Sequence, residues 1–183
     1  LFLARLRRDL WSRVPSDAVI LEVGVGTGAN IPYYPSSADV AAIDLSERML
    51  ERATARARRL GVEVDLSLMD AQHLTYEDES FDVVVAQYVV NTVPNPEATL
   101  DEFARVLKPG GEIVLLNRIG AESGPRHTVE RWLMPVVQRL GWRSEFPWAR
   151  LSRWAERTHG LRLIERRPMP PMALSTTDLR TGA

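Results

Sequence analysis

The chain contains no cysteine among its 183 residues, and it contains only three histidines. The missing cysteines exclude disulfides and thiolate chemistry, and so few histidines argue against a zinc site. The chain also lacks any apolar run of the roughly 18 residues that a membrane-spanning helix needs. It does not begin with a basic and then apolar signal peptide. These absences predict a cytoplasmic enzyme without a zinc site.

The length and composition predict one globular domain over residues 1–183. A chain of this length can enclose a substantial core, and its fractions of 45% hydrophobic and 26% charged residues are ordinary for such a domain. The first residue is Leu1 rather than methionine, so we expect the native N-terminus to lie upstream of this sequence.

The net charge of −1 hides two regions of opposite charge. Residues 1–117 carry 11 basic and 18 acidic side chains, a balance of −7. Residues 118–167 carry 11 arginines and five acidic side chains, together with four of the five tryptophans. This division predicts two regions with different roles, a core over residues 18–117 and a basic, tryptophan-rich helical segment over residues 118–167.

Apolar runs and helix signals alternate along the chain. Strands are predicted at 19–25, 39–45, 62–69, 81–87, 112–117 and 161–166, and helices at 2–14, 47–60, 96–107, 125–141 and 147–159. Ser46 is expected to cap the helix 47–60 and Gly61 to end it. The tail after Pro168 is ambiguous between a proline-rich loop and a last strand. Such alternation predicts an α/β fold with a doubly wound, mostly parallel sheet that is covered by helices on both faces.

The strongest local signal is the sequence Glu22-Val-Gly-Val-Gly-Thr-Gly28, at the point where the first strand is expected to turn into a helix. Glycines allow positive φ and a close approach of the backbone to a ligand. A doubly wound sheet binds its ligand at the carboxyl ends of its strands, where this turn must lie. A tight turn without any ligand is the alternative interpretation.

A nicotinamide-binding enzyme is a competing hypothesis, because Gly24, Gly26 and Ala29 satisfy the pattern G-x-G-x-x-A. Asp44, at the end of the second strand, suits either hypothesis, since its carboxylate can accept hydrogen bonds from both hydroxyls of a ribose. A solvated carboxylate at a strand end is the remaining interpretation of Asp44.

Later motifs separate these hypotheses. Asp70 follows the third strand in Met-Asp-Ala, where its carboxylate can accept a hydrogen bond from an adenine amino group. Phe-Asp-Val-Val-Val-Ala at 81–86 and Leu-Lys-Pro-Gly-Gly at 107–111 come next in order. Over residues 18–117 this series resembles the class I methyltransferases that use S-adenosylmethionine. The resemblance implies a Rossmann-like sheet of seven strands, S-adenosylhomocysteine as the product, and no metal.

The resemblance also implies the residues that hold the cofactor. The glycines would shape the loop around its methionine portion, Glu22 would orient that loop near the amino group, and Asp44 would bind the ribose. Leu45 and Met49 would lie against the adenine, Asp70 and Ala71 would hold its edge, and Gln87 would face the point of methyl transfer. The complete set is Glu22, Gly24, Gly26, Thr27, Gly28, Asn30, Asp44, Leu45, Met49, Asp70, Ala71 and Gln87.

Nucleic acid is not expected as the substrate. Enzymes that methylate the exocyclic amino groups of bases usually show Asn/Asp-Pro-Pro-aromatic after the fourth strand, where this chain has Gln-Tyr-Val-Val-Asn at 87–91. The acidic balance of residues 1–117 also opposes the broad basic surface that nucleic acid requires.

A second resemblance, to the soluble bacterial phosphatidylethanolamine N-methyltransferases, extends over most of the chain. It is carried by residues 87–96, 99–107, 117–118, 124–126, 132, 141–143 and 145–148. It implies stepwise methylation of phosphatidylethanolamine towards phosphatidylcholine. A quinone C-methyltransferase, a small-molecule N-methyltransferase and a non-catalytic module that senses S-adenosylmethionine are the alternatives.

Five residues are candidates for substrate chemistry. Tyr88 and His127 could accept the proton of the attacking amine, and Asn91 could orient that amine. Arg118 and Arg126 could bind the lipid phosphate through paired hydrogen bonds. With the tryptophans, the arginines predict peripheral binding to anionic lipids at the inner face of the membrane and no obligate protein partner. An ordinary helical cover, with tryptophans in the core and solvated arginines, is the alternative.

Overall fold

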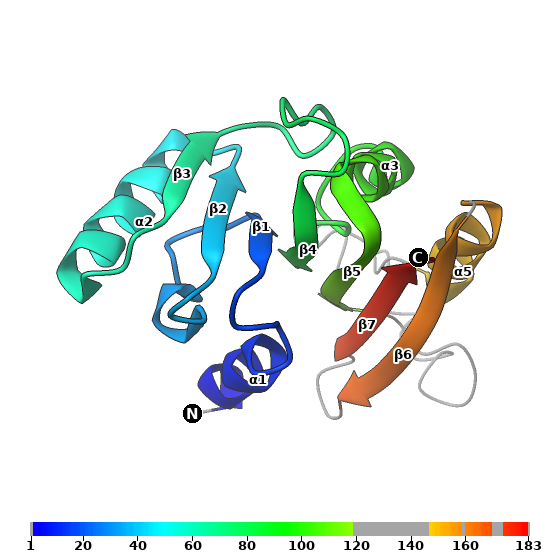
Figure 1. Ribbon diagram of the computed structural model, residues 1–183, viewed down its shortest axis with the longest axis horizontal. Helices are drawn as coiled ribbons and strands as arrows, with labels where there is room; N and C mark the ends of the chain where they lie inside the picture. The colour runs from blue at the N-terminus through cyan, green and yellow to red at the C-terminus, as the bar shows by residue number, and fades with distance from the viewer. Residues whose placement is uncertain (1, 119–146, 159, 170–173, 183) are drawn as a thin grey trace, which may run out of the picture.

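The computed structural model describes residues 2–118, 147–158, 160–169 and 174–182. Its centre is one sheet of seven strands in the order β3-β2-β1-β4-β5-β7-β6 (Figure 1). The strands are β1 (Val19–Val23), β2 (Asp39–Asp44), β3 (Asp65–Leu68), β4 (Phe81–Gln87), β5 (Leu107–Arg118), β6 (Leu161–Met169) and β7 (Leu174–Thr181). Strands β1 to β5 pair in parallel, and β7 is antiparallel to both β5 and β6. The predicted doubly wound, mostly parallel sheet is therefore confirmed.

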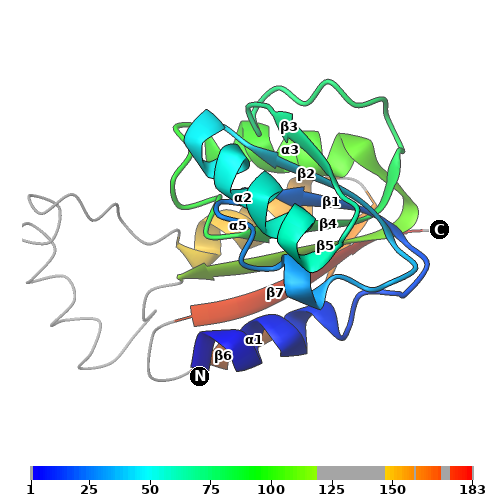
Figure 2. The same cartoon turned by 90° about the vertical axis from the view of Figure 1, so that its left-hand side faces the viewer.

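Helices cover both faces of the sheet. Helices α3 (Pro96–Val106) and α5 (Trp148–Arg157) share one apolar core with the sheet, and α1 (Phe2–Trp11) packs on the opposite face. Figure 2 shows α1 at the bottom of the view, below β5 and β7, and α3 in its upper part. Helix α2 (Glu47–Leu60) forms a smaller core with β2 and the loop after β1. Within these described elements, no helix is long and apolar enough to cross a membrane.

The strand order reverses between β1 and β4, which creates a switch point at the carboxyl ends of these strands. Strand β1 is hydrogen-bonded to β2 on one side and to β4 on the other, so that Glu22 pairs with Ala42 and with Val85. The connections after β1 and β4 leave in opposite directions along the sheet, and ligands of such sheets bind in the crevice between them. The glycine-rich turn begins at this point, one residue after Val23.

Helix α2 has the boundaries that the sequence predicts. The hydroxyl of Ser46 accepts a hydrogen bond from the backbone N–H of Met49 at 3.4 Å. Gly61 ends the helix with φ +65°, and its N–H bonds to the carbonyls of Ala57 and Arg58. A serine cap and a left-handed glycine are strong local signals, which explains the agreement.

Other elements differ from the prediction. Between β1 and β2, where every residue is described, the chain forms no α-helix but only the short 3-10 helix η1 (Ile31–Tyr33). Pro35 follows this helix closely and lacks the N–H group that a longer helix needs. Strand β3 is confined to residues 65–68, at the edge of the sheet. Strand β5 begins at Leu107, five residues early, and its pairing with β4 shifts register between Phe81 and Val83. The helix predicted at 125–141 lies outside the described residues.

Two of the motifs that suggested the family begin at the end of the sheet opposite the glycine turn. Asp82 accepts hydrogen bonds from the backbone N–H of Val19 at 2.8 Å and from Nζ of Lys108 at 2.9 Å. These contacts tie together the beginnings of β1, β4 and β5. The motifs at 81–86 and 107–111 therefore fix the sheet itself.

Candidate cofactor site

The turn after β1 is held against the end of β2 by backbone hydrogen bonds. The N–H groups of Gly24 and Val25 both donate to the carbonyl of Ile43, at 2.9 and 3.0 Å. Gly26 and Gly28 have φ of +56° and +71°, a region that L side chains rarely adopt. The turn therefore depends on glycine for its path.

These two glycines have different surroundings. A Cβ atom on Gly28 would lie 2.5 Å from Cδ1 of Ile31 and 3.1 Å from the Cα of Ala53, so Gly28 lets the turn pack against α2. A Cβ atom on Gly26 would meet no protein atom within 4 Å. The backbone of Gly26 thus borders the space at the switch point, which fits the predicted cradle for a cofactor.

Asp44 ends β2 beside this turn and is partly buried. Its Oδ2 accepts a hydrogen bond from the N–H of Gly26 at 2.8 Å, and its Oδ1 accepts one from the N–H of Ser46 at 2.9 Å. A carboxylate offers about four acceptor positions, so two remain for the hydroxyls of a ribose. Asp44 therefore also shapes the glycine turn, a role that the sequence did not reveal.

Glu22 is fully buried on β1, on the face of the sheet that carries η1. Its two carboxylate oxygens accept hydrogen bonds from Nδ2 of Asn30 and from the hydroxyl of Tyr34. Burial raises the pKa of Glu22 to about 7, although these hydrogen bonds and the charge of Arg7 act to lower it. The sequence pointed to Glu22 and Asn30 but not to Tyr34 or Arg7, because neither position carries a motif signal.

The predicted adenine contacts lie at the ends of β2 and β3. Leu45 is 72% exposed immediately after β2. Met49 is partly buried on α2, as is Thr27 in the turn, and Ala71 is buried. These residues and Asp70 follow neighbouring parallel strands, which places them along one edge of the sheet.

Asp70 already accepts hydrogen bonds within its own turn. Its Oδ1 accepts the backbone N–H of Gln72 at 2.9 Å, and His73 lies 3.7 Å from its Oδ2. The hydrogen bond from Gln72 is the main cause that lowers the pKa of Asp70. Asp70 thus presents an ionised, partly exposed carboxylate that is held in place by its neighbours.

The residues after β4 form the other side of the switch point. The side-chain amide nitrogen of Gln87 is buried and has no hydrogen-bond partner among the described residues. Tyr88 has φ +61°, while its N–H donates to the carbonyl of Leu116 at 2.7 Å. A positive φ is strained for an aromatic residue, and such strain collects at functional sites. Asn91 follows, partly buried and engaged in polar interactions.

The remaining substrate candidates cannot be placed beside these residues. His127 and Arg126 lie outside the described part of the chain. Arg118 ends β5, two residues beyond Leu116, the register partner of Gln87, but only its backbone is described.

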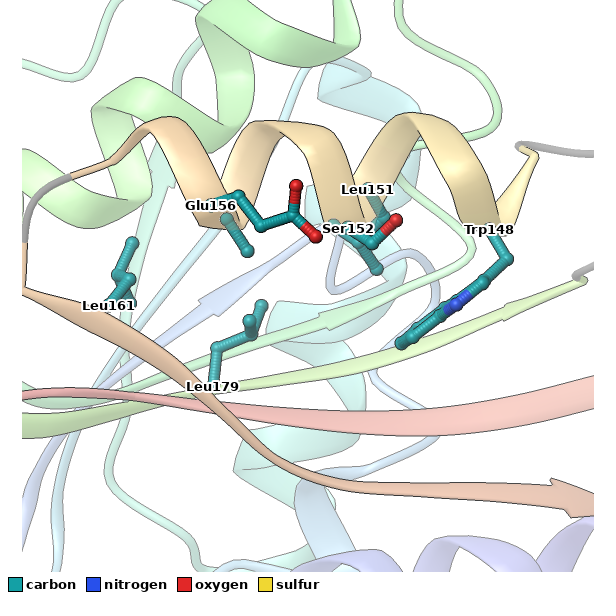
Figure 3. A pocket seen from close by; sticks show the side chains of 7 residues that line it. Trp148, Leu151, Ser152, Glu156, Leu161 and Leu179 are labelled. Carbon is teal, nitrogen blue, oxygen red and sulfur yellow. The ribbon is translucent and has the colours of Figure 1, made fainter.

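A separate apolar groove lies between α5 and the strands β6 and β7 (Figure 3). Trp148, Leu151, Ser152 and Glu156 line it from the helix, and Leu161 and Leu179 line it from the sheet. Strands β4 and β5 separate this end of the sheet from the glycine turn. The groove therefore lies apart from the switch point.

Comparisons with known proteins agree with this geometry. Residues 21–115 match the family model of the methyltransferase domain. The chain is 40% identical, over 159 residues, to a phosphatidylethanolamine N-methyltransferase of Cereibacter sphaeroides, covering 86% of this chain and 76% of that protein. It is 34% identical, over 143 residues, to a demethylmenaquinone methyltransferase of Renibacterium salmoninarum, covering 73% of this chain but only 59% of that protein.

The fold is also shared with solved structures. A protein of Bacillus halodurans C-125 that is assigned to the methyltransferases superposes with a TM-score of 0.82 at 17% identity, over 97% of this chain and 99% of that one. The family match excludes the nicotinamide-binding alternative and accounts for the glycine turn. The chain therefore belongs to the methyltransferase family, as a class I enzyme that uses S-adenosylmethionine.

Proposed function

We propose that this enzyme is a phospholipid N-methyltransferase that converts phosphatidylethanolamine stepwise towards phosphatidylcholine. The observation that carries this proposal is the 40% identity, over 86% of the chain, to the Cereibacter sphaeroides enzyme. Methylation of a quinone carbon is the second candidate, because the demethylmenaquinone methyltransferase of Renibacterium salmoninarum is 34% identical.

The residues at the switch point fit S-adenosylmethionine. When bound, this cofactor supplies a methyl group whose carbon is electrophilic because it is attached to a sulfonium. The Gly26 backbone borders open space, Asp44 keeps acceptor positions for hydroxyl groups, and exposed Leu45 offers an apolar surface to a base. We propose that the rest of the cofactor set named from the sequence lines the same crevice, with Gln87 closest to the transferred methyl group.

The chain's own contribution to catalysis is alignment and removal of water. Displacement at a sulfonium carbon requires the attacking nitrogen in line with the leaving sulfur, and a dry site favours the loss of the positive charge on sulfur. We propose that the strained backbone of Tyr88 and the amide of Asn91 set the position of the amine. Both residues follow the carboxyl end of β4, at the switch point.

The amine must lose a proton before it attacks. Its pKa in solution should resemble that of a lysine, about 10, so nearby cations and a dry site would help to deprotonate it. We propose that the hydroxyl of Tyr88 or the imidazole of His127 accepts or relays this proton, and that Arg118 and Arg126 bind the lipid phosphate. Paired hydrogen bonds from a guanidinium suit a phosphodiester, which a quinone substrate lacks.

The choice between the two substrates can be tested directly. Purified enzyme with S-adenosylmethionine and vesicles of phosphatidylethanolamine is expected to yield mono-, di- or trimethylated lipid, measured by mass spectrometry, together with S-adenosylhomocysteine. A demethylated quinone in the same vesicles should remain unchanged. Methylated quinone without methylated lipid would reverse the ranking of the two candidates.

A phospholipid headgroup lies at the bilayer surface, so we propose that residues 118–167 dock there through their arginines. Trp154 of this range is buried in the core and does not take part. Each arginine near an anionic surface contributes about 1 kcal/mol of attraction, which salt screens. Reversal of Arg126, Arg139 and Arg143 to glutamate should therefore remove at least about 3 kcal/mol and abolish co-sedimentation with anionic vesicles.

A matched variant controls for the change in net charge. Arg52, Arg58 and Arg59 are exposed on α2, so their reversal to glutamate alters the total charge equally in another region. This control should still pellet with anionic vesicles, and both variants should bind S-adenosylmethionine normally. If both triple variants lose vesicle binding to the same extent, the basic segment has no special role in docking.

A further inference from the structure

Tyr34 stands directly after η1 and reaches back to β1. Its hydroxyl donates a hydrogen bond to one oxygen of Glu22, while the amide of Asn30 donates to the other. Both oxygens of this carboxylate are therefore held by side chains from the segment between β1 and β2. The pair fixes the orientation of Glu22 at the beginning of the glycine turn.

The ring of Tyr34 also contacts the first helix. Its centroid lies 4.7 Å from that of Trp11, with the ring planes inclined by 54°, so the two rings are in direct contact. Trp11 ends α1 and is only 2% exposed. Tyr34 thus forms a continuous contact from α1 to the carboxylate of Glu22.

Several groups face Glu22 and act on its charge. Burial is the strongest effect and favours the neutral acid, and the nearby carboxylate of Asp44 acts in the same direction. The hydrogen bonds from Tyr34 and Asn30 and the positive charge of Arg7, on α1, favour the carboxylate. Burial beside Glu22 raises the pKa of Tyr34 itself, so its hydroxyl stays protonated and remains a donor.

We infer that Tyr34 is a positioning residue of the cofactor site, which keeps Glu22 oriented and ionised for the ammonium group of S-adenosylmethionine and links this carboxylate to the packing of α1. The inference rests on the proposed placement of the cofactor at the glycine turn. An anion at Glu22 attracts the ammonium group, whereas the protonated acid does not. Cofactor affinity should therefore rise with pH as Glu22 loses its proton.

Tyr34→Phe tests the inference through the pH dependence of cofactor binding, measured by calorimetry with S-adenosylhomocysteine between pH 5.5 and 9. Loss of a hydrogen bond to a charged group should weaken binding about tenfold at pH 7. Because this hydrogen bond lowers the pKa of Glu22, its loss should move the rise in affinity to higher pH. The affinities of the variant and the parent should then converge near pH 9.

Four further variants make the result specific. Tyr33→Phe is the matched control, since the Tyr33 hydroxyl forms no hydrogen bond within the described chain, and its profile should equal that of the parent. Glu22→Gln should remove the rise with pH, and adding Tyr34→Phe to it should cause no further loss. Trp11→Leu should reproduce part of the shift, and an unchanged profile would overturn the link to α1.

The outcomes also separate this inference from the placement of the cofactor. If Tyr34→Phe lowers affinity equally at every pH, or leaves it unchanged, Tyr34 is not a positioning residue for Glu22. If Asp44→Ala leaves affinity unchanged, the placement of the cofactor itself is wrong. If Asp44→Ala binds the cofactor weakly while Tyr34→Phe has the same pH profile as the parent, the role of Tyr34 is refuted and the placement of the cofactor is retained.

Discussion

Asp44→Ala is expected to weaken the binding of S-adenosylmethionine by at least about a hundredfold. Two hydrogen bonds from ribose hydroxyls to a carboxylate should contribute roughly 1.5–3 kcal/mol each. The substitution also leaves the N–H of Gly26 without its acceptor, so the glycine turn loses a contact of 2.8 Å. Both effects act on the same crevice, and calorimetry with the purified protein measures their sum.

The control for this prediction lies on the same strand. Asp39 begins β2 and is exposed, at the opposite end of the strand from Asp44. Asp39→Ala removes the same charge and should leave cofactor affinity within about twofold, because charges this far apart in water are largely screened. Equal affinities for the two alanine variants would refute the placement of the ribose at Asp44.

Trp154→Ala is expected to lower the free energy of unfolding by about 3–5 kcal/mol, the usual cost of removing a buried tryptophan. The side chain is 2% exposed within the core that joins α3, α5 and the sheet. Its indole N–H also donates to Oδ1 of Asp101, on α3, at 2.7 Å. Urea denaturation gives the free energy directly.

Two substitutions separate burial from the hydrogen bond. Trp154→Phe keeps an aromatic ring but loses the donor, and Asp101→Asn keeps an acceptor on an exposed residue. We expect a loss of about 1–2 kcal/mol for the first and less than about 1 kcal/mol for the second. A cost for Asp101→Asn as large as that for Trp154→Ala would show that the hydrogen bond, rather than the packing, secures α5.

The sequence predicts those features that depend on neighbouring residues. The strand at 81–87 and the capped helix 47–60 have the boundaries that the sequence predicts, since apolar runs and caps are local signals. The turn between β1 and β2 was predicted to lead into a helix, although Pro32 is visible in the sequence. The glycine pattern usually precedes a helix and therefore predicts one here, whereas the prolines limit the structure to η1.

Contacts between distant residues could not be predicted in this way. The sequence indicates that Asp44 ends a strand, but its hydrogen bond to Gly26 depends on the register of β1 against β2. Tyr34 lies 12 positions from Glu22 in a segment without regular periodicity, so nothing local joins them. The position of β7 between β5 and β6 could not be predicted either, because it depends on how strands pair across the whole sheet.

The position of β7 sets the order in which the sheet can be completed during translation. This strand is last among the described strands along the chain, yet it lies between β5 and β6 and bonds to both. While residues 174–181 are still inside the ribosome, the outer edge of β5 has no strand to pair with. Unpaired edges recruit other chains and favour aggregation. A nascent chain stalled before residue 174 should therefore depend on a chaperone that shields β5.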